Sequence, residues 1–321
     1  RRARRILPAA TLVVVATTAA ALALLPELRW AEITRQGTAS LLWVQNWLLA
    51  SDSVDYLAEG SAPSPFQHFW SLSIEEQFYV VWPVLLVAVL WWQSRTRAAR
   101  AASRPADARR AALALVLVLT LVSFVCSVSM TTAGDPAAYF VSQTRFWELG
   151  IGALLALVAL RTVGPTARAV CAWGGLVLIA GGMVLVPIDG FPGALALVPT
   201  VGAALVIVPA RAGSTPIVRR LSSVGPVLWL GDVSYSLYLW HWPLVVLAPY
   251  AVARVVGSST TTEASPAALG AVLVISLGLA GLTRRVVEVP CHRGLRPHVS
   301  ARAVLSAAVV MLVVSVAVVQ V

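Results

Sequence analysis

Apolar runs of about twenty residues are the feature that most constrains this chain. Residues 6–25 and 301–321 form two of them, and several others approach this length. An apolar helix of roughly 20 residues spans the 30 Å hydrocarbon core of a bilayer. The chain is 59% hydrophobic and 12% charged, whereas soluble domains are about half apolar and a quarter charged. The sequence therefore predicts a polytopic membrane protein.

The runs are predicted to cross the membrane as helices, because every backbone polar group in lipid needs an internal partner. The fold class is therefore an all-α transmembrane helix bundle with about nine spans. The predicted spans are residues 6–25, 72–92, 111–130, 146–160, 170–186, 193–208, 233–253, 267–282 and 301–321. Residues 40–50 are too short to cross, and we expect them to form an interfacial or re-entrant segment held by Trp43 and Trp47.

The arginines predict the orientation of the chain. All 24 basic residues are arginines, and the net charge is +10. Nucleic-acid binding is the alternative for so basic a chain, but the arginines cluster in short loops between apolar runs, as in cytoplasmic loops. With the RRARR start in the cytoplasm, every arginine-rich loop falls on that side and the C-terminus lies outside. We expect a plasma-membrane protein that contacts the bilayer and binds no nucleic acid.

Three cysteines and four histidines show no metal-ligand or redox spacing. We therefore expect unpaired thiols and no metal site. The basic start followed by an apolar run is also compatible with a signal peptide, although twenty apolar residues suit a spanning helix better. Since the chain does not begin with methionine, we expect it to be a fragment of a longer protein.

Two adjacent carboxylates interrupt the second predicted span, in HFWSLSIEEQFYVVWPVLL (68–86). Ser73 and Glu76 have the spacing of a helix-capping box, which favours a structural role for Glu76. At helical spacing, Glu75 shares a face with three aromatic residues, Phe78, Tyr79 and Trp82. Intramembrane carboxylates usually face a bundle interior or a wet cavity. Glu75 is therefore a candidate catalytic residue.

Arg145 and Glu148 are three residues apart in SQTRFWELGIGALLAL, at the outer start of another predicted helix. One interpretation is that they simply pair with each other. The other is that Arg145 faces Glu75 or an anionic group across a shared cavity. The small residues Gly150 and Gly152 would let a neighbouring helix approach closely.

Tyr235, Tyr238 and His241 follow one another at three-residue intervals in GDVSYSLYLWHWPLVVL, so they can share a helix face. His241 lies several residues inside a predicted span. It is either a buried histidine bonded to a neighbour or a proton-handling or ligand-binding residue.

Arg2 and Arg5 lie one helical turn apart at the inner end of the first predicted span. A basic flank of this kind can anchor a helix at the membrane surface. Alternatively, the planar guanidinium groups suit the phosphates of a cytosolic cofactor. Both interpretations place the two side chains in the cytoplasm.

Together these stretches resemble the integral-membrane acyltransferase family 3, which includes bacterial O-antigen and peptidoglycan O-acetylases. RRARRILPA is similar to the start of that family's third helix, and HFWSLSIEEQFYVVWPVLL resembles its most recognisable segment. TRFWELGIGALLAL and VSYSLYLWHWPL match later signatures in the same order. The resemblance implies that Glu75 is the fixed acid and that Arg2 and Arg5 form the two-arginine motif. His68, which begins the second stretch, is a further candidate.

The resemblance implies transfer of an acyl group, commonly acetyl, from cytosolic acyl-CoA to a carbohydrate hydroxyl at the outer face. Acyl-CoA would be a co-substrate rather than a bound cofactor, and Arg145 would stabilise the developing oxyanion. The family's arginine–histidine motif lies on a first helix, expected upstream of Arg1. Residues 1–300 would then be an acyltransferase domain lacking two helices, inactive by itself. Residues 301–321 are similar to the helix that tethers an extracytoplasmic domain in some members.

Two other classes of function remain open from the sequence. A transporter or flippase for a lipid-linked saccharide would also need intramembrane charges, although we find no convincing internal repeat of the kind that many transporters show. A non-catalytic membrane scaffold would place every polar residue above in a satisfied contact within the bundle. Convergence of Glu75, Arg145 and His241 on one cavity would favour the enzyme.

Overall fold

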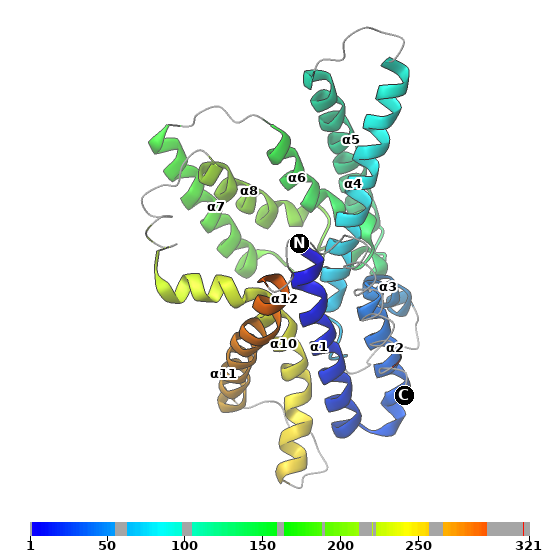
Figure 1. Cartoon of the computed structure of the whole chain (residues 1–321), viewed down its shortest axis with the longest axis vertical. Helices are drawn as coiled ribbons and strands as arrows, with labels where there is room; N and C mark the ends of the chain where they lie inside the picture. Colours follow the sequence, from blue (N-terminus) through cyan, green and yellow to red (C-terminus); the bar gives the residue numbers. More distant parts are fainter. Residues whose placement is uncertain are drawn as a thin grey trace. The chain divides into compact units, whose positions relative to one another are not determined.

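A computed structural model describes residues 2–54, 63–97, 105–158, 164–187, 190–211, 220, 223–256, 266–293 and 317, and these residues form helices and no strand (Figure 1). The long helices are α1 (Arg2–Leu24), α4 (Phe69–Arg97), α5 (Pro105–Thr132), α7 (Pro165–Leu185), α10 (Gly225–Val256) and α11 (Pro266–Thr283). The shorter helices are α2 (Trp30–Leu41), α3 (Gln45–Val54), α6 (Phe146–Leu157), α8 (Leu197–Arg211) and α12 (Val289–Arg293). The remaining turns are η1 (Glu27–Arg29), η3 (Pro136–Tyr139), η4 (Ser142–Thr144), η5 (Ala194–Ala196) and the π-helical turn η6 (Arg284–Glu288).

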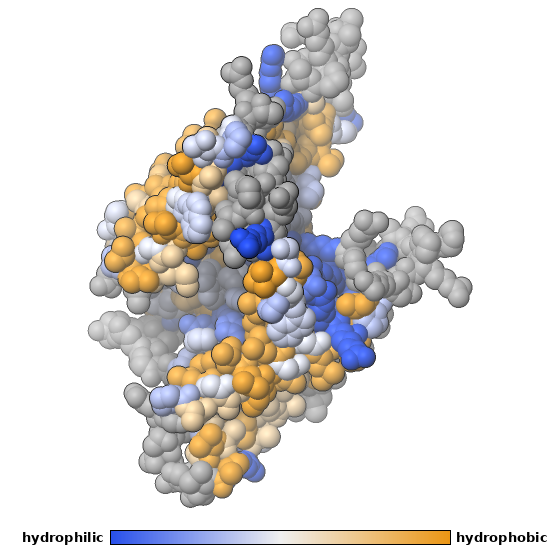
Figure 2. All heavy atoms as spheres, turned by 90° about the vertical axis from the view of Figure 1, so that its left-hand side faces the viewer, coloured by the Kyte–Doolittle hydropathy of each residue, from blue (hydrophilic) through white to orange (hydrophobic). Residues whose placement is uncertain are grey.

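Six helices in the described part of the chain are long and apolar enough to cross a membrane, and they coincide with six of the predicted spans. Two further predicted spans correspond to shorter apolar helices, Phe146–Leu157 and Ala194–Val208. The last predicted span, 301–321, lies outside the described residues apart from Ala317. The chain is thus a multi-pass membrane protein, and the number nine stays a prediction. Apolar side chains cover much of the face seen in Figure 2, as a lipid-facing surface requires.

Residues 40–50, predicted to form an interfacial or re-entrant segment, are not one continuous helix, and their location at the membrane interface stays a prediction. Helix α2 ends at Leu41, and α3 begins at Gln45 after a turn. Trp43 has a φ of 59° in that turn, a conformation that breaks a helix. The side chain of Gln45 is buried and donates to Gln36 Oε1 at 3.0 Å. A buried polar contact between the two helices fixes this corner. The length of the predicted segment does not reveal such a contact.

The prediction of a capping box at Ser73 is wrong, because α4 begins at Phe69, four residues earlier. Ser73 lies inside the helix, where its hydroxyl donates to the carbonyl oxygen of Phe69 at 2.9 Å. The preceding turn is closed by the backbone N–H of Phe66, which donates to Ser64 Oγ at 3.2 Å. Glu76 therefore does not serve as the reciprocal cap of Ser73.

The helices fall into two compact units. Unit 1 comprises Arg1–Leu48, Glu59–Ser73 and Gly225–Val321, and unit 2 comprises Leu49–Ala58 and Ile74–Val224. In unit 1, α1 packs against α2 and α10, and α10 packs against α11. Buried apolar side chains of α1 and α10, including Val13, Val14 and Leu239, belong to one core cluster of this unit. Unit 1 therefore combines the first helices of the described chain with its last helices.

In unit 2, α5 pairs with α6 and α7 pairs with α8. Small residues permit both pairings, as in many membrane bundles. A Cβ at Gly150 would clash with Thr120 Oγ1 of α5. A Cβ at Gly175 would lie 2.5 Å from the carbonyl oxygen of Gly202 in α8. The predicted close approach is thus confirmed at Gly150, whereas a Cβ at Gly152 would meet nothing within 4 Å.

Candidate active site

The arginine turn at the start of α1 is held by residues of α10 and η6. Arg5 Nε donates to Glu288 Oε2 at 3.4 Å. Glu288 is 4% exposed, and its other oxygen accepts a hydrogen bond from the Ser236 hydroxyl. The Tyr235 hydroxyl donates to the carbonyl oxygen of Ile6 at 3.0 Å. Arg5 and Tyr235, both predicted site residues, therefore meet at one end of unit 1.

Tyr238 and His241 belong to a second polar cluster, one turn and two turns further along α10. The Tyr238 hydroxyl donates to the carbonyl oxygen of His68 at 2.6 Å and lies 2.5 Å from the hydroxyl of Ser71. The rings of His68 and His241 have centroids 5.8 Å apart. His241 Nδ1 lies 2.7 Å from the carbonyl oxygen of Tyr238, which it can approach only as a donor, so Nε2 is the basic nitrogen.

His68 is 7% exposed, and neither ring nitrogen has a hydrogen-bond partner among the residues that the structure describes. Burial, and then the neighbouring His241, lower the pKa of His68 to about 3. The backbones of Leu239 and Pro65 act in the opposite direction and raise the pKa of His68. Neither backbone forms a hydrogen bond with the ring. The His68 side chain is therefore a neutral imidazole at physiological pH, in the turn that precedes α4.

His241 and Tyr238 also line a groove of about 520 Å³ between α10 and α11. Most of its wall is aliphatic, and Ser234 and Ser276 supply further hydroxyl groups. Such a lining combines an apolar surface with a few polar groups that can orient a ligand. Of the two interpretations of His241, its bond to a neighbouring carbonyl is confirmed, and its position in this groove is compatible with proton handling.

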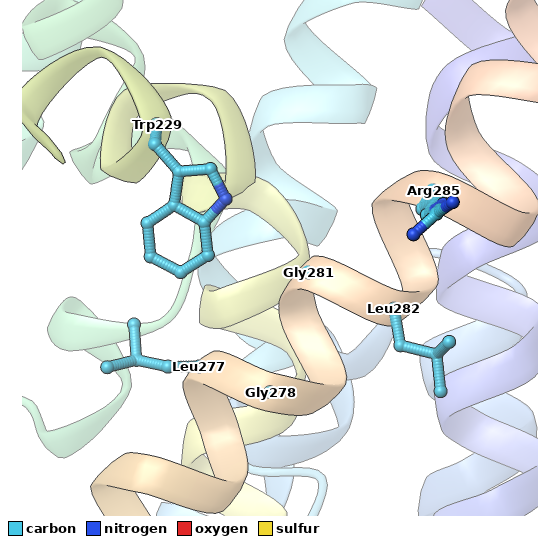
Figure 3. Close-up of a pocket in the computed structure, with 6 residues that line it drawn as sticks. All are labelled: Trp229, Leu277, Gly278, Gly281, Leu282 and Arg285. Atoms are coloured by element: carbon cyan, nitrogen blue, oxygen red, sulfur yellow. The ribbon is translucent and has the colours of Figure 1, made fainter. Parts of the chain in front are cut away.

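A second groove, of about 410 Å³, lies further along α11 (Figure 3). The indole of Trp229 faces the helix at Gly278 and Gly281, where no side chain projects, and Arg285 lies at the end of the groove. None of its lining residues was predicted to belong to the site.

In unit 2, Arg145 is fixed by several partners. It is 6% exposed; Nη1 donates to Glu148 Oε1 at 2.7 Å, and Nε donates to the carbonyl oxygen of Tyr139 at 3.2 Å. Its guanidinium carbon lies 4.8 Å from the ring centroid of Tyr139 and 5.2 Å from that of Phe191, within cation–π range. The predicted pairing of Arg145 with Glu148 is confirmed. Buried charges persist when they are paired in this way.

Glu75 and Glu76 lie on the first turns of α4, and both are partly buried and engaged in contacts. The next residue, Gln77, accepts a hydrogen bond from Ser142 at 2.5 Å. The aromatic face predicted beside Glu75 is present, since Phe78 and Trp82 stack with centroids 5.6 Å apart. Because Glu75 and Arg145 belong to unit 2 and His241 belongs to unit 1, their convergence on one cavity stays a prediction.

Four residues at these clusters were missed by the sequence analysis: Ser71, Gln77, Ser236 and Glu288. The first three stand within one to three residues of predicted ones, so motif membership was a usable signal. Glu288 follows two arginines and was included in a predicted cytoplasmic loop. Its signal is a carboxylate in RRVVEVP, a segment otherwise rich in arginine and apolar residues.

Buried ion pairs and polar clusters within apolar helices are features of a multi-pass membrane enzyme. The chain belongs to the integral-membrane acyltransferase family 3, because the sequence profile described as an acyltransferase domain matches residues 1–285.

Among its relatives is the putative peptidoglycan O-acetyltransferase YrhL of Bacillus subtilis, 31% identical over 275 residues. The peptidoglycan O-acetyltransferase OatA of Listeria monocytogenes is 28% identical over 260 residues. Each alignment covers 77% of this chain and 39% of the relative, so the chain spans about two fifths of these proteins. No solved structure matches the chain.

Proposed function

We propose that this chain is the membrane domain of an O-acyltransferase that moves an acetyl group from cytosolic acetyl-CoA to a hydroxyl of a cell-envelope glycan. The family match over residues 1–285 carries the proposal. Two relatives are named as peptidoglycan O-acetyltransferases, which makes peptidoglycan the first acceptor to test. Family membership gives no support to the alternative of a saccharide transporter.

In the proposed reaction the acceptor hydroxyl oxygen attacks the acyl carbonyl carbon. The carbon–sulfur bond of the thioester breaks, and the hydroxyl proton is transferred to the leaving thiolate. A positioned base contributes typically about 10²–10⁴ in rate. We assign acceptance or relay of this proton to Glu75, and His241 is a second proton carrier with a basic Nε2.

Arg145 is proposed to stabilise the negative charge on the carbonyl oxygen in the transition state. Electrostatic catalysis requires donors that are fixed before the reaction. Glu148 and the Tyr139 carbonyl hold the guanidinium at 2.7 and 3.2 Å, and the aromatic rings of Tyr139 and Phe191 flank it. This support favours a preorganised cation over a mobile surface arginine.

Arg2 and Arg5 are proposed to bind the phosphates of acetyl-CoA. Both lie in the first turns of α1, and the Arg5 side chain is 48% exposed, so its guanidinium is accessible from water. Guanidinium groups bind phosphate through two parallel hydrogen bonds. The assignment places the RRARR end in the cytoplasm, in agreement with the arginine-rich loops.

The test uses the full-length protein in its native membrane, because the domain by itself is expected to be inactive, and acetyl-CoA labelled in the acetyl group. Glu75→Gln should abolish transfer of label to glycan and leave membrane insertion intact, because glutamine is isosteric but cannot accept the proton. Glu27→Gln, at an exposed carboxylate in η1, is the matched control and should transfer normally. Normal transfer by Glu75→Gln would remove Glu75 from the mechanism, and absence of transfer by the unmodified protein would reject the proposed function.

A further inference from the structure

Glu288 is a buried carboxylate in direct contact with the proposed donor-binding arginine. Burying a carboxylate costs several kcal/mol unless it is paired and hydrogen-bonded. Here the Ser236 hydroxyl binds one oxygen, and Arg5 Nε lies 3.4 Å from the other. Because Glu288 is 4% exposed and Arg5 is 48% exposed, the carboxylate is the fixed partner and the guanidinium is the one that reaches solvent.

Ser236 anchors Glu288 to α10, and two further contacts on the same face of α10 lie on either side of this anchor. Asp232, Ser236 and Trp240 recur every four residues and so lie on one face of α10. Asp232 Oδ2 pairs with Arg284 Nη2 at 2.7 Å. The Trp240 indole donates to Thr283 Oγ1 at 2.9 Å. Glu288 thus lies in a π-helical turn that packs against α10. Turns of this kind are often found at functional sites.

The same helix also fixes the backbone beside Arg5. The Tyr235 hydroxyl donates to the carbonyl oxygen of Ile6, the next residue in α1. Neighbouring residues of α10, Tyr235 and Ser236, therefore hold the arginine turn through its backbone and through the carboxylate of Glu288. A guanidinium carries five N–H donors in one plane, and Glu288 is the one partner of Arg5 in the described part of the chain, bound at Nε.

We infer that Glu288 is a positioning residue of the donor site. Its carboxylate holds Arg5 by Nε, so that the terminal nitrogens present a fixed pair of donors to the phosphates of acyl-CoA. This inference rests on the proposed function, which assigns Arg5 to the donor. A long side chain that is already ordered loses less rotamer freedom when it binds, so Glu288 strengthens donor binding without touching the donor.

The test measures the Kd of coenzyme A for the purified, detergent-solubilised full-length protein and the KM for acetyl-CoA in acetyl transfer. Glu288→Ala should weaken coenzyme A binding about tenfold, equivalent to about 1.4 kcal/mol, and raise the KM similarly. The kcat at saturating acetyl-CoA should stay within about twofold. Glu288→Gln should restore binding to within about threefold of the unmodified protein, because the amide oxygen can still accept from Arg5 Nε.

Asp232→Asn is the matched control, because it weakens another contact of η6 without touching Glu288 and should leave the Kd unchanged. If Glu288→Ala does not fold, Ser236→Ala serves instead, because it frees the carboxylate from its anchor and should weaken binding about threefold. A Kd that rises equally in Asp232→Asn, or that rises in neither Glu288→Ala nor Ser236→Ala, overturns the inference.

Arg5→Ala separates failure of the inference from failure of the proposed function. If Arg5→Ala weakens coenzyme A binding and the Glu288 variants do not, the donor site stands and the positioning role is rejected. If Arg5→Ala has no effect, or the unmodified protein binds no coenzyme A, the assignment of Arg5 to the donor is rejected and the inference falls with it.

Discussion

Burial changes the acid–base chemistry of His68. Burial beside His241 lowers its pKa to about 3 from the ordinary value of 6.5. Between these two pH values the unfolded chain binds a proton that the folded chain does not bind. The contribution of His68 to stability is therefore complete above pH 6.5 and is lost as the pH falls toward 3.

We predict that the free energy of unfolding of the purified protein falls between pH 7 and pH 5, by up to about 1.4 kcal/mol per pH unit below 6.5. Thermal unfolding in detergent at intervals of half a pH unit measures this slope. In His68→Phe the ring cannot be protonated, so this part of the slope should disappear. An identical slope in both proteins would show that other groups cause the acid sensitivity.

At the scale of helices, close backbone contact decides how α7 and α8 pair. Two adjacent glycines of α7 have opposite surroundings. A Cβ at Gly175 would lie 2.5 Å from the backbone oxygen of Gly202, whereas a Cβ at Gly174 would meet nothing within 4 Å. A backbone atom cannot rotate away as a flexible side chain can, so the helices would have to separate.

Gly175→Ala should therefore destabilise the protein by about 1–3 kcal/mol, the usual cost of overpacking. Gly174→Ala should be neutral or slightly stabilising, because alanine favours the helix over glycine. Thermal unfolding of the two variants in the same detergent compares them directly. Equal stability of the two would mean that α7 and α8 do not make this contact.

The existence of most helices could be predicted from the sequence, because long apolar runs leave a chain in lipid no other backbone solution. Helix ends could not be predicted so well. Ser73 has the spacing of a cap yet lies inside α4, because the turn from Ser64 starts the helix earlier. Likewise the corner at Trp43 depends on the buried pair Gln36 and Gln45, a contact between helices.

In the candidate site, likewise, the sequence predicts contacts between neighbouring residues but not contacts between distant helices. Arg145 with Glu148 could be predicted, because residues three apart on a helix are neighbours. Arg5 with Glu288 could not, because the two are 283 residues apart and only the packing of η6 against α1 brings them together. Glu288 was also obscured by the arginines beside it, which predict a cytoplasmic loop, whereas the structure continues as helix through η6 and α12.

For the whole molecule, the short helices α6 and α8 decide whether the predicted topology holds. Helix α6 has 12 residues, about 18 Å at 1.5 Å per residue, against a hydrocarbon core of about 30 Å. Yet the arginines near 109 and 168 fall on the same side of the membrane only if the chain turns back through α6. The pairing of α6 with α5 can shield a short crossing from lipid.

Single cysteines test this crossing after the three unpaired native cysteines, Cys126, Cys171 and Cys291, are replaced by serine. Ala133→Cys, at the end of α5, should react with a membrane-impermeant maleimide in intact cells. Thr166→Cys, in the first turn of α7, should react only after permeabilisation, like Ala3→Cys at the arginine turn; all three positions are exposed in the structure. If position 166 reacts in intact cells, α6 does not cross. Arg161 and Arg168 would then be extracytoplasmic, so the positive-inside argument would fail there. The cytoplasmic assignment of Arg2 and Arg5 would have to rest on the reactivity of Ala3→Cys alone.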